Sequence, residues 1–163
     1  MIDEFVYVEG KKYRRGYTSG SCACGASKAA LRLLLENRPI NKVRIGTPKG
    51  IDLDLVVENI SWGQDWAQCS IRKDGGDDID ATHGMDIFAR LDLVEPDQVP
   101  DFRSDLDSDY LFITSGQGIG RVTKKGLDIG IGRPAINRVP LGMILKEVQE
   151  TIDELGLDIY DYL

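Results

Sequence analysis

Cationic and hydroxyl side chains gather near the N-terminus, in the segment 11–21. Four of the first five positions of this segment are lysine or arginine, and the hydroxyl side chains of Thr18, Ser19 and Ser21 follow. A segment with helical periodicity comes next, and the first N–H groups of a helix carry the positive end of its dipole. The combination predicts an anion site suited to carboxylates or phosphates, with an exposed basic loop and ordinary helix capping as the alternative.

A second stretch, 71–84, places four carboxylates, two cations and the only histidine close together. Asp74, Asp77 and Asp78 suggest calcium ligation, but the EF-hand pattern needs glycine at position six and glutamate at position twelve. Counted from Asp74, isoleucine and methionine occupy those positions, so no metal site is predicted. His83 is a candidate base, with capping of the loop as the more common role for a single histidine.

The third stretch is a glycine cluster that follows an apolar segment. Six glycines fall between positions 116 and 132, and such density allows close approach of the backbone to a ligand or repeated positive φ. A dinucleotide-binding fingerprint needs a third glycine three positions after the second, and the spacing of Gly116, Gly118 and Gly120 does not meet it. The stretch is therefore either backbone that contacts a ligand or a cluster of tight turns.

Composition narrows the class of protein. The chain has 163 residues, 42% of them hydrophobic, and a net charge of −7, which predicts one globular domain and argues against nucleic acid or an anionic membrane as partner. The first residues do not read as a signal peptide and no apolar run is long enough to span a bilayer, so we expect a cytoplasmic protein. Cys22, Cys24 and Cys69 lack the number and spacing of a disulfide framework or a zinc site, and we expect buried thiols.

Two helices are predicted from apolar residues spaced at about 3.6 positions. The first is expected over 22–36, with Ser19 or Ser21 as N-cap and an asparagine and a proline after its end. The second starts with Pro140 at its first helical position and runs to Leu155.

Alternation of apolar and polar residues predicts strands between these helices. The strand segments are 42–45, 51–58, 66–72 and 86–93, with a more fully apolar strand at 110–114. A turn at 61–65 is expected to join the second and third strands into a hairpin, and 97–109 is expected to be a solvated acidic loop. This order predicts an α+β fold: a two-layer sandwich in which helices pack on one face of a mostly antiparallel sheet, as a single domain over 1–163.

Four separated segments carry a family likeness. In chain order they are Arg14-Arg15-Gly16-Tyr17-Thr18-Ser19-Gly20-Ser21-Cys22-Ala23, then Lys73-Asp74-Gly75-Gly76-Asp77-Asp78 with Asp80 and Thr82-His83-Gly84, then Gly118-Ile119-Gly120-Arg121-Val122-Thr123-Lys124, and finally Pro134-Ala135-Ile136-Asn137. They resemble the CbiD family, the cobalt-precorrin-5B C1-methyltransferases of anaerobic cobalamin (vitamin B12) biosynthesis. The resemblance implies S-adenosylmethionine-dependent methylation of C-1 of cobalt-precorrin-5B to give cobalt-precorrin-6A.

Family members continue into a second, Rossmann-like half that carries much of the S-adenosylmethionine site. The resemblance therefore implies that the chain corresponds to the N-terminal domain, either as part of a longer protein or as a shortened relative. Its implied partners are the cobalt-precorrin and either the absent C-terminal half or a second copy, with neither nucleic acid nor membrane. A corrinoid-binding module without catalysis is the alternative, and a domain whose glycine and aspartate loops serve only the fold is a third hypothesis.

The resemblance also implies roles for particular residues. A flat macrocycle rimmed with acetate and propionate groups needs dispersed cations, hydroxyls and backbone donors. The substrate-binding residues implied are Arg14, Arg15, Thr18, Ser19, Ser21, Lys73, Asp74, Asp78, Thr123, Lys124, Arg133 and Asn137. Asp77 is the implied candidate for a catalytic base, and Gly116, Gly118 and Gly120 are implied beside S-adenosylmethionine. Cobalt arrives with the substrate, so no metal site in the protein is implied.

Overall fold

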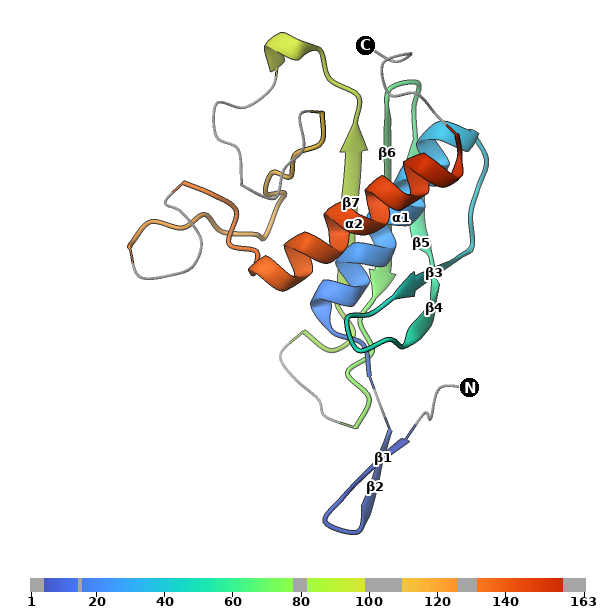
Figure 1. The fold of residues 1–163 in the computed structure, drawn as a ribbon, viewed down its shortest axis with the longest axis vertical. Coiled ribbons are helices and arrows are strands. Elements are labelled where there is room, and N and C mark those ends of the chain that lie inside the picture. The colour runs from blue at the N-terminus through green and yellow to red at the C-terminus, as the bar shows by residue number, and fades with distance from the viewer. Residues whose placement is uncertain (1–4, 15, 78–81, 99–109, 126–131, 157–163) are drawn as a thin grey trace.

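The structure, a computed structural model, describes residues 5–14, 16–77, 82–98, 110–125 and 132–156 (Figure 1). The elements in chain order are β1 (Phe5–Val8), β2 (Lys11–Arg14), α1 (Ser19–Glu36), β3 (Lys42–Gly46), β4 (Asp52–Val56), β5 (Glu58–Trp62), β6 (Trp66–Arg72), β7 (Asp86–Asp92), the 3-10 turn η1 (Pro96–Gln98) and α2 (Arg138–Glu154). None of the described helices is both long enough and apolar enough to cross a membrane.

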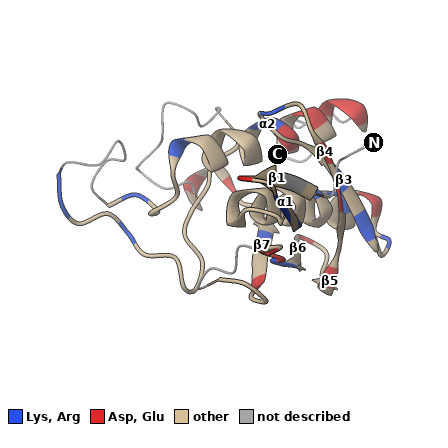
Figure 2. Cartoon of the chain, turned by 90° about the horizontal axis from the view of Figure 1, so that it is seen from below, with Lys and Arg blue, Asp and Glu red and all other residues tan. Residues whose placement is uncertain are grey.

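The described strands pair antiparallel, and both helices lie on one side of the sheet formed by β5, β6 and β7. The described strands pair as β1 with β2, β3 with β4, and β5 with β6 and β7 in that order. Helix α1 lies against β6, β7 and β3, and α2 packs on the opposite side of α1 (Figures 1 and 2). The predicted α+β class, with helices on one face of antiparallel strands, is confirmed.

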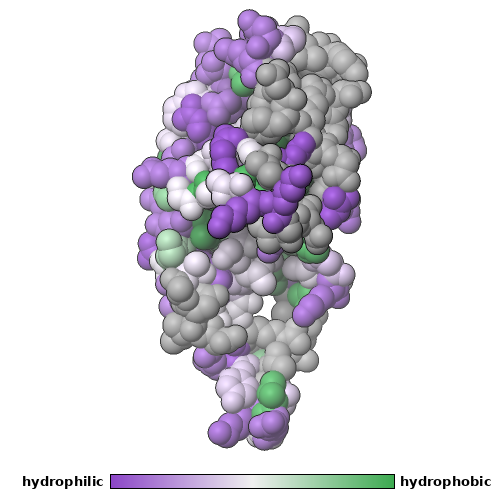
Figure 3. All heavy atoms as spheres, turned by 90° about the vertical axis from the view of Figure 1, so that its left-hand side faces the viewer, coloured by the Kyte–Doolittle hydropathy of each residue, from purple (hydrophilic) through white to green (hydrophobic). Residues whose placement is uncertain are grey.

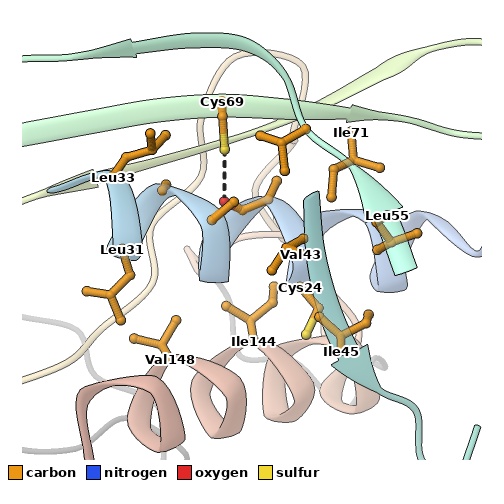
Figure 4. Close-up of a cluster of buried hydrophobic side chains, with 14 of the residues drawn as sticks. Cys24, Leu31, Leu33, Val43, Ile45, Leu55, Cys69, Ile71, Ile144 and Val148 are labelled. Carbon is orange, nitrogen blue, oxygen red and sulfur yellow. Dashed lines mark hydrogen bonds between the residues drawn. The ribbon is translucent and has the colours of Figure 1, made fainter. Parts of the chain in front are cut away.

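The core lies between α1 and its neighbours (Figure 4). Small side chains on α1, including fully buried Cys22, Cys24 and Ala26, let the helix approach both the sheet and α2 closely. Burial raises the pKa of the Cys22 thiol to about 11 and the pKa values of Cys24 and Cys69 to about 12. The thiols therefore stay protonated at neutral pH, and Cys69 Sγ donates to the Ala26 carbonyl at 3.2 Å, which confirms that they are structural groups.

Both helices begin earlier than predicted. Thr18, in extended conformation, is the N-cap of α1, and its Oγ1 accepts from the Ser21 N–H at 3.0 Å, so the predicted caps Ser19 and Ser21 lie inside the first turn. Asn137 is the N-cap of α2, which places Pro140 at the third helical position rather than the first. Proline is accommodated there because the first four N–H groups of a helix have no partner within it.

Two strand predictions are wrong. The predicted strand 51–58 ends at Val56 as β4, which pairs with β3. A separate strand, β5, begins at Glu58, forms the hairpin with β6 and includes the first two residues of the predicted turn 61–65. The alternation of apolar and polar residues indicates which face of a sheet each side chain occupies. It does not indicate that the chain moves to another sheet between Val56 and Glu58. The predicted strand 110–114 is irregular, and its apolar pattern arises because Leu111 and Ile113 pack against the core without strand pairing.

Two further differences concern loops. The hairpin of β1 and β2 was not predicted, because the alternation in 5–8 is short and 11–14 is too rich in cations to suggest a buried strand face. Most of the predicted acidic loop 97–109 lies outside the described residues.

A largely buried ion pair joins the two helices to β3. Glu147 on α2 accepts from Lys28 Nζ of α1 at 3.1 Å through Oε2, and from the Gly46 N–H at 3.1 Å through Oε1. Side-chain exposure is 14% for Lys28 and 10% for Glu147, so little water reaches the two charged groups. Loss of one partner leaves the other charge buried and uncompensated.

We predict that Glu147→Met and Lys28→Met each lower the free energy of unfolding by about 3 kcal/mol, because each leaves one buried charge without its partner. The double variant should lose clearly less than the sum of the single losses, since it removes both charges together. Urea unfolding followed by circular dichroism measures all three free energies. Additive losses would show that the two side chains do not depend on each other.

Candidate functional site

The first two motifs meet in space although about sixty residues separate them. The guanidinium of Arg14 binds the Asp74 carboxylate through two hydrogen bonds, Nη1 to Oδ2 at 2.6 Å and Nη2 to Oδ1 at 2.8 Å. The Arg14 N–H donates to Asp77 Oδ2 at 2.6 Å, and the Asp77 N–H donates to the Arg14 carbonyl at 3.1 Å. The end of β2 is thereby fastened to the loop that follows β6.

Glycine at position 16 makes this contact possible. A Cβ atom on Gly16 would overlap the backbone of residues 74–76, so a side chain there would force the two segments apart. The next residue closes the contact, because the Tyr17 N–H donates to the Asp74 carbonyl at 2.6 Å. The chain that enters α1 therefore lies directly on the aspartate loop.

A cluster of hydroxyls and one lysine lies behind this contact at the start of α1. We call Thr18, Ser19, Ser21, Lys73 and Thr82 the hydroxyl–lysine cluster. Lys73 is only 5% exposed, and its Nζ donates to Thr82 Oγ1 at 2.5 Å. Ser19 Oγ lies 3.4 Å from the same Thr82 oxygen, and Thr18 Oγ1 donates to Ser21 Oγ at 3.0 Å. A buried ammonium and several hydroxyls thus share the end of α1 that carries the positive end of its dipole.

Both helices point their N-termini toward this end of the molecule. The start of α2 packs on the start of α1, since a Cβ atom on Gly20 would lie 2.8 Å from Pro140 Cβ. Asn137, the N-cap of α2, is exposed, and its side chain makes no capping hydrogen bond. The sequence offered no signal for this convergence, because periodicity predicts helices but not which of their ends meet.

Asp74 and Asp77, the described aspartates of the loop, both make hydrogen bonds that hold it in place. Hydrogen bonds from Arg14 and from the Gly76 N–H lower the pKa of Asp74 to about 2. The Gly75 N–H donates to His83 Nδ1 at 2.9 Å, which fits the loop-capping role considered for this histidine. Among the residues that the structure describes, no group of three or more His, Cys, Asp or Glu side chains is placed to hold a metal ion.

The described parts of the glycine-rich motif, 116–125 and 132–136, pair with each other antiparallel beside the start of α2 (Figure 1). We call them the glycine-rich turn. Its described hydrogen bonds run within the segment, from the Val122 N–H to the Arg133 carbonyl at 2.9 Å and from the Ala135 N–H to the Gly120 carbonyl at 2.8 Å. Added Cβ atoms at Gly116, Gly118 and Gly120 would meet nothing within 4 Å. Only the positive φ of Gly118, +83°, gives a structural reason for glycine among these three.

The structure therefore groups some of the implied site residues and leaves others apart. Those joined by hydrogen bonds in the two sets just described are Arg14, Thr18, Ser19, Ser21, Lys73, Asp74 and Asp77. Thr123 and Lys124 are exposed and Arg133 is half-buried, all on the glycine-rich turn. Arg15 and Asp78 lie outside the described residues. Thr82 was not a predicted site residue, although it stands in the quoted Thr82-His83-Gly84 motif.

We predict that the Asp74 carboxyl titrates near pH 2 and that Arg14→Gln moves this pKa up toward the ordinary value of 3.8. Since the pKa is lower in the folded protein, the contribution of Asp74 to stability is present above about pH 4 and is lost as the pH falls toward 2. Nuclear magnetic resonance of the carboxyl carbon measures the midpoint, and Arg44→Gln, which removes the partner of Asp54, is the matched control. A midpoint near 3.8 in the unaltered chain would contradict the ion pair.

Comparison with known proteins gives the family. The CbiD family model matches residues 6–160. The cobalt-precorrin-5B C(1)-methyltransferase of Clostridioides difficile (strain 630) is 48% identical, with 94% of this chain and 41% of that protein covered. The protein of the same name from Thermoanaerobacter sp. (strain X514) is 44% identical, with 94% of this chain and 38% of that protein covered.

A solved structure shows the same fold. The crystal structure of the cobalamin biosynthesis protein (cbiD) from Archaeoglobus fulgidus matches with a TM-score of 0.61 and 24% sequence identity, over 94% of this chain and 44% of that chain. The chain thus spans less than half the length of the relatives described here. The family match over nearly all of its residues shows that the chain belongs to the CbiD family.

Proposed function

We propose that the chain forms the substrate-binding N-terminal part of a cobalt-precorrin-5B C1-methyltransferase. The observation that carries the proposal is the convergence of Arg14, the aspartate loop and the hydroxyl–lysine cluster at the start of α1. The family membership and the names of the relatives support the reaction assigned to the whole enzyme.

The hydroxyl–lysine cluster is suited to a carboxylate on the rim of the substrate. Ser19 and Thr82 are half-buried and present hydroxyl donors, while the nearly buried Lys73 ammonium supplies positive charge directly behind Thr82. Hydrogen bonds to a charged acceptor are stronger than those between neutral groups, and a site with little water strengthens them further. Several such contacts fix the orientation of a large macrocycle, and orientation alone can supply about 7–11 kcal/mol of the barrier reduction in a transfer reaction.

Asp74 and Asp77 act in this proposal chiefly as positioning residues. Asp74 holds the Arg14 guanidinium, and Asp77 pairs with the Arg14 backbone, so both set the position of the segment that enters α1. Asp77 is exposed beside this segment, and we retain it as the candidate acceptor for a proton released on methylation. Asp78, Arg15, Thr123, Lys124, Arg133 and Asn137 remain proposed substrate contacts on the ground of motif position alone.

The methyl donor that we propose is S-adenosylmethionine, with cobalt entering only as part of the substrate. The space beside Gly116, Gly118 and Gly120 is open. These three glycines stay proposed beside the donor on the ground of motif position alone. We propose the cytoplasm as the location of the protein. Its proposed partner is the remaining part of the enzyme or a second copy of the chain.

We predict that the chain binds cobyrinic acid, a cobalt corrinoid with free carboxylates, more tightly than cobinamide, whose side chains are amidated. Ser19→Ala should weaken binding of the acid by about fivefold, because it removes a hydroxyl donor. Lys73→Gln should weaken it by about tenfold or more, because it removes the positive charge behind Thr82. Lys49→Gln and Ser27→Ala are matched controls, since Lys49 is exposed on the β3–β4 turn and Ser27 donates to the Ala23 carbonyl of its own helix. Isothermal titration gives the affinities.

The far-ultraviolet circular dichroism spectrum checks that each variant is folded, and Ser19→Ala keeps the test decisive if Lys73→Gln unfolds. Equal binding of the two corrinoids, or no effect of Ser19→Ala in a folded protein, would contradict the site. Catalysis is tested by co-expression with the C-terminal half of a CbiD relative, in which cobalt-precorrin-5B should gain the mass of one CH2 unit, because the added methyl group replaces a proton. Binding of the acid without this gain would favour a binding module that does not catalyse.

A further inference from the structure

The hairpin of β1 and β2 projects from the body of the molecule next to the aspartate loop (Figure 1). Its two strands pair only with each other in the described structure, and the described side chains of both strands are exposed, Tyr7 at 70%. A two-stranded hairpin has little stability of its own in water. The bonds that Arg14 makes to Asp74 and Asp77 therefore hold the hairpin in place, although none of its described residues belongs to the core cluster.

The strand register assigns the side chains of the hairpin to two opposite faces. Phe5 pairs with Arg14 and Tyr7 with Lys12, and residues that pair directly or alternate along a strand share a face. We call these four residues the aromatic–cationic face. Lys12 Nζ lies 3.8 Å from the centre of the Phe5 ring, a cation–π contact that places both side chains on this face.

The opposite face carries similar residue types in a different arrangement. Lys11 pairs with Val8, and Tyr13 with Val6, so one lysine and one tyrosine lie there. Figure 3 shows hydrophobic and hydrophilic side chains next to each other on the projection at the bottom of the molecule. Each face therefore offers one tyrosine and one lysine for comparison, Tyr7 and Lys12 on one face and Tyr13 and Lys11 on the other.

We infer that the aromatic–cationic face is a contact surface for the flat, polycarboxylated ring of the substrate, with Tyr7 against the ring and Lys12 against a carboxylate on its rim. The inference rests on the proposed function and adds to it a part of the binding surface outside the motifs that carry the family resemblance. It names Tyr7, which was not a predicted site residue, and Lys12, which lies in the basic segment 11–21 but was predicted to have no specific role.

Three observations favour this occupant. The face is continuous with the candidate site, because Arg14 belongs to it and its guanidinium binds Asp74. Its cations stand on a chain of net charge −7, so they attract an anionic ligand that most of the surface repels. Exposed aromatic rings beside a cation suit a planar ligand with charged edges, since one surface meets both its apolar face and its polar rim.

The test compares the two faces in cobyrinic acid binding, followed by quenching of tryptophan fluorescence. Tyr7→Ala and Lys12→Gln should each weaken binding by about fivefold, whereas Tyr13→Ala and Lys11→Gln should change it less than twofold. Because all four side chains are exposed, the variants should fold. An unchanged pKa of Asp74, measured as above, shows that the hairpin is still docked.

The possible results separate this inference from the proposed function. Wild-type binding that depends on Lys73 and Ser19 but not on Tyr7 or Lys12, or that depends equally on both faces, would overturn the inference and leave the proposed function standing. Absence of binding by the unaltered chain would overturn both. Binding unaffected by Tyr7→Ala, together with a change in association state by sedimentation, would assign the face to a second copy of the chain and overturn its role with substrate.

Discussion

The close contact between the chain entering α1 and the loop after β6 is the constraint on which the candidate site depends. Gly16 lies so near the backbone of residues 74–76 that no side chain fits between them, and Tyr17 and Arg14 bond to the same loop. This contact fixes where the hydroxyls of the first turn of α1 lie relative to Lys73 and Thr82. About sixty residues separate the two segments in the sequence, and this contact brings Arg14 onto the aspartate loop.

The packing of the core explains how Gly16 is held so close to residues 74–76. Helix α1 is held from one side by the sheet and from the other by α2, and the Lys28–Glu147 pair ties both helices to β3. Close-packed interiors transmit small displacements, so a rigid α1 keeps its first turn in register with the loop. The candidate site residues lie at one end of this rigid layer, and the glycine-rich turn lies beside the start of α2 (Figure 1).

Local patterns predicted the helices, β6, β7 and the α+β class, because amphipathic periodicity reflects burial directly. They failed where pairing decides the structure: the break between β4 and β5 and the irregular segment at Leu111 and Ile113 both depend on which strand lies alongside. The family resemblance is confirmed, and the motifs that carry it contain Lys73 and Ser19, which stay proposed site residues. The role of Thr82 and the two faces of the hairpin depend on contacts across many residues, which no local pattern records.

The central claim is that a polycarboxylated corrinoid binds where these segments converge, and backbone chemical-shift mapping of the chain with cobyrinic acid tests it most directly. The account predicts that the largest shifts fall in residues 7–21 and 73–85, with smaller ones at the start of α2. Shifts centred on β4 and β5, or confined to the glycine-rich turn, would contradict it.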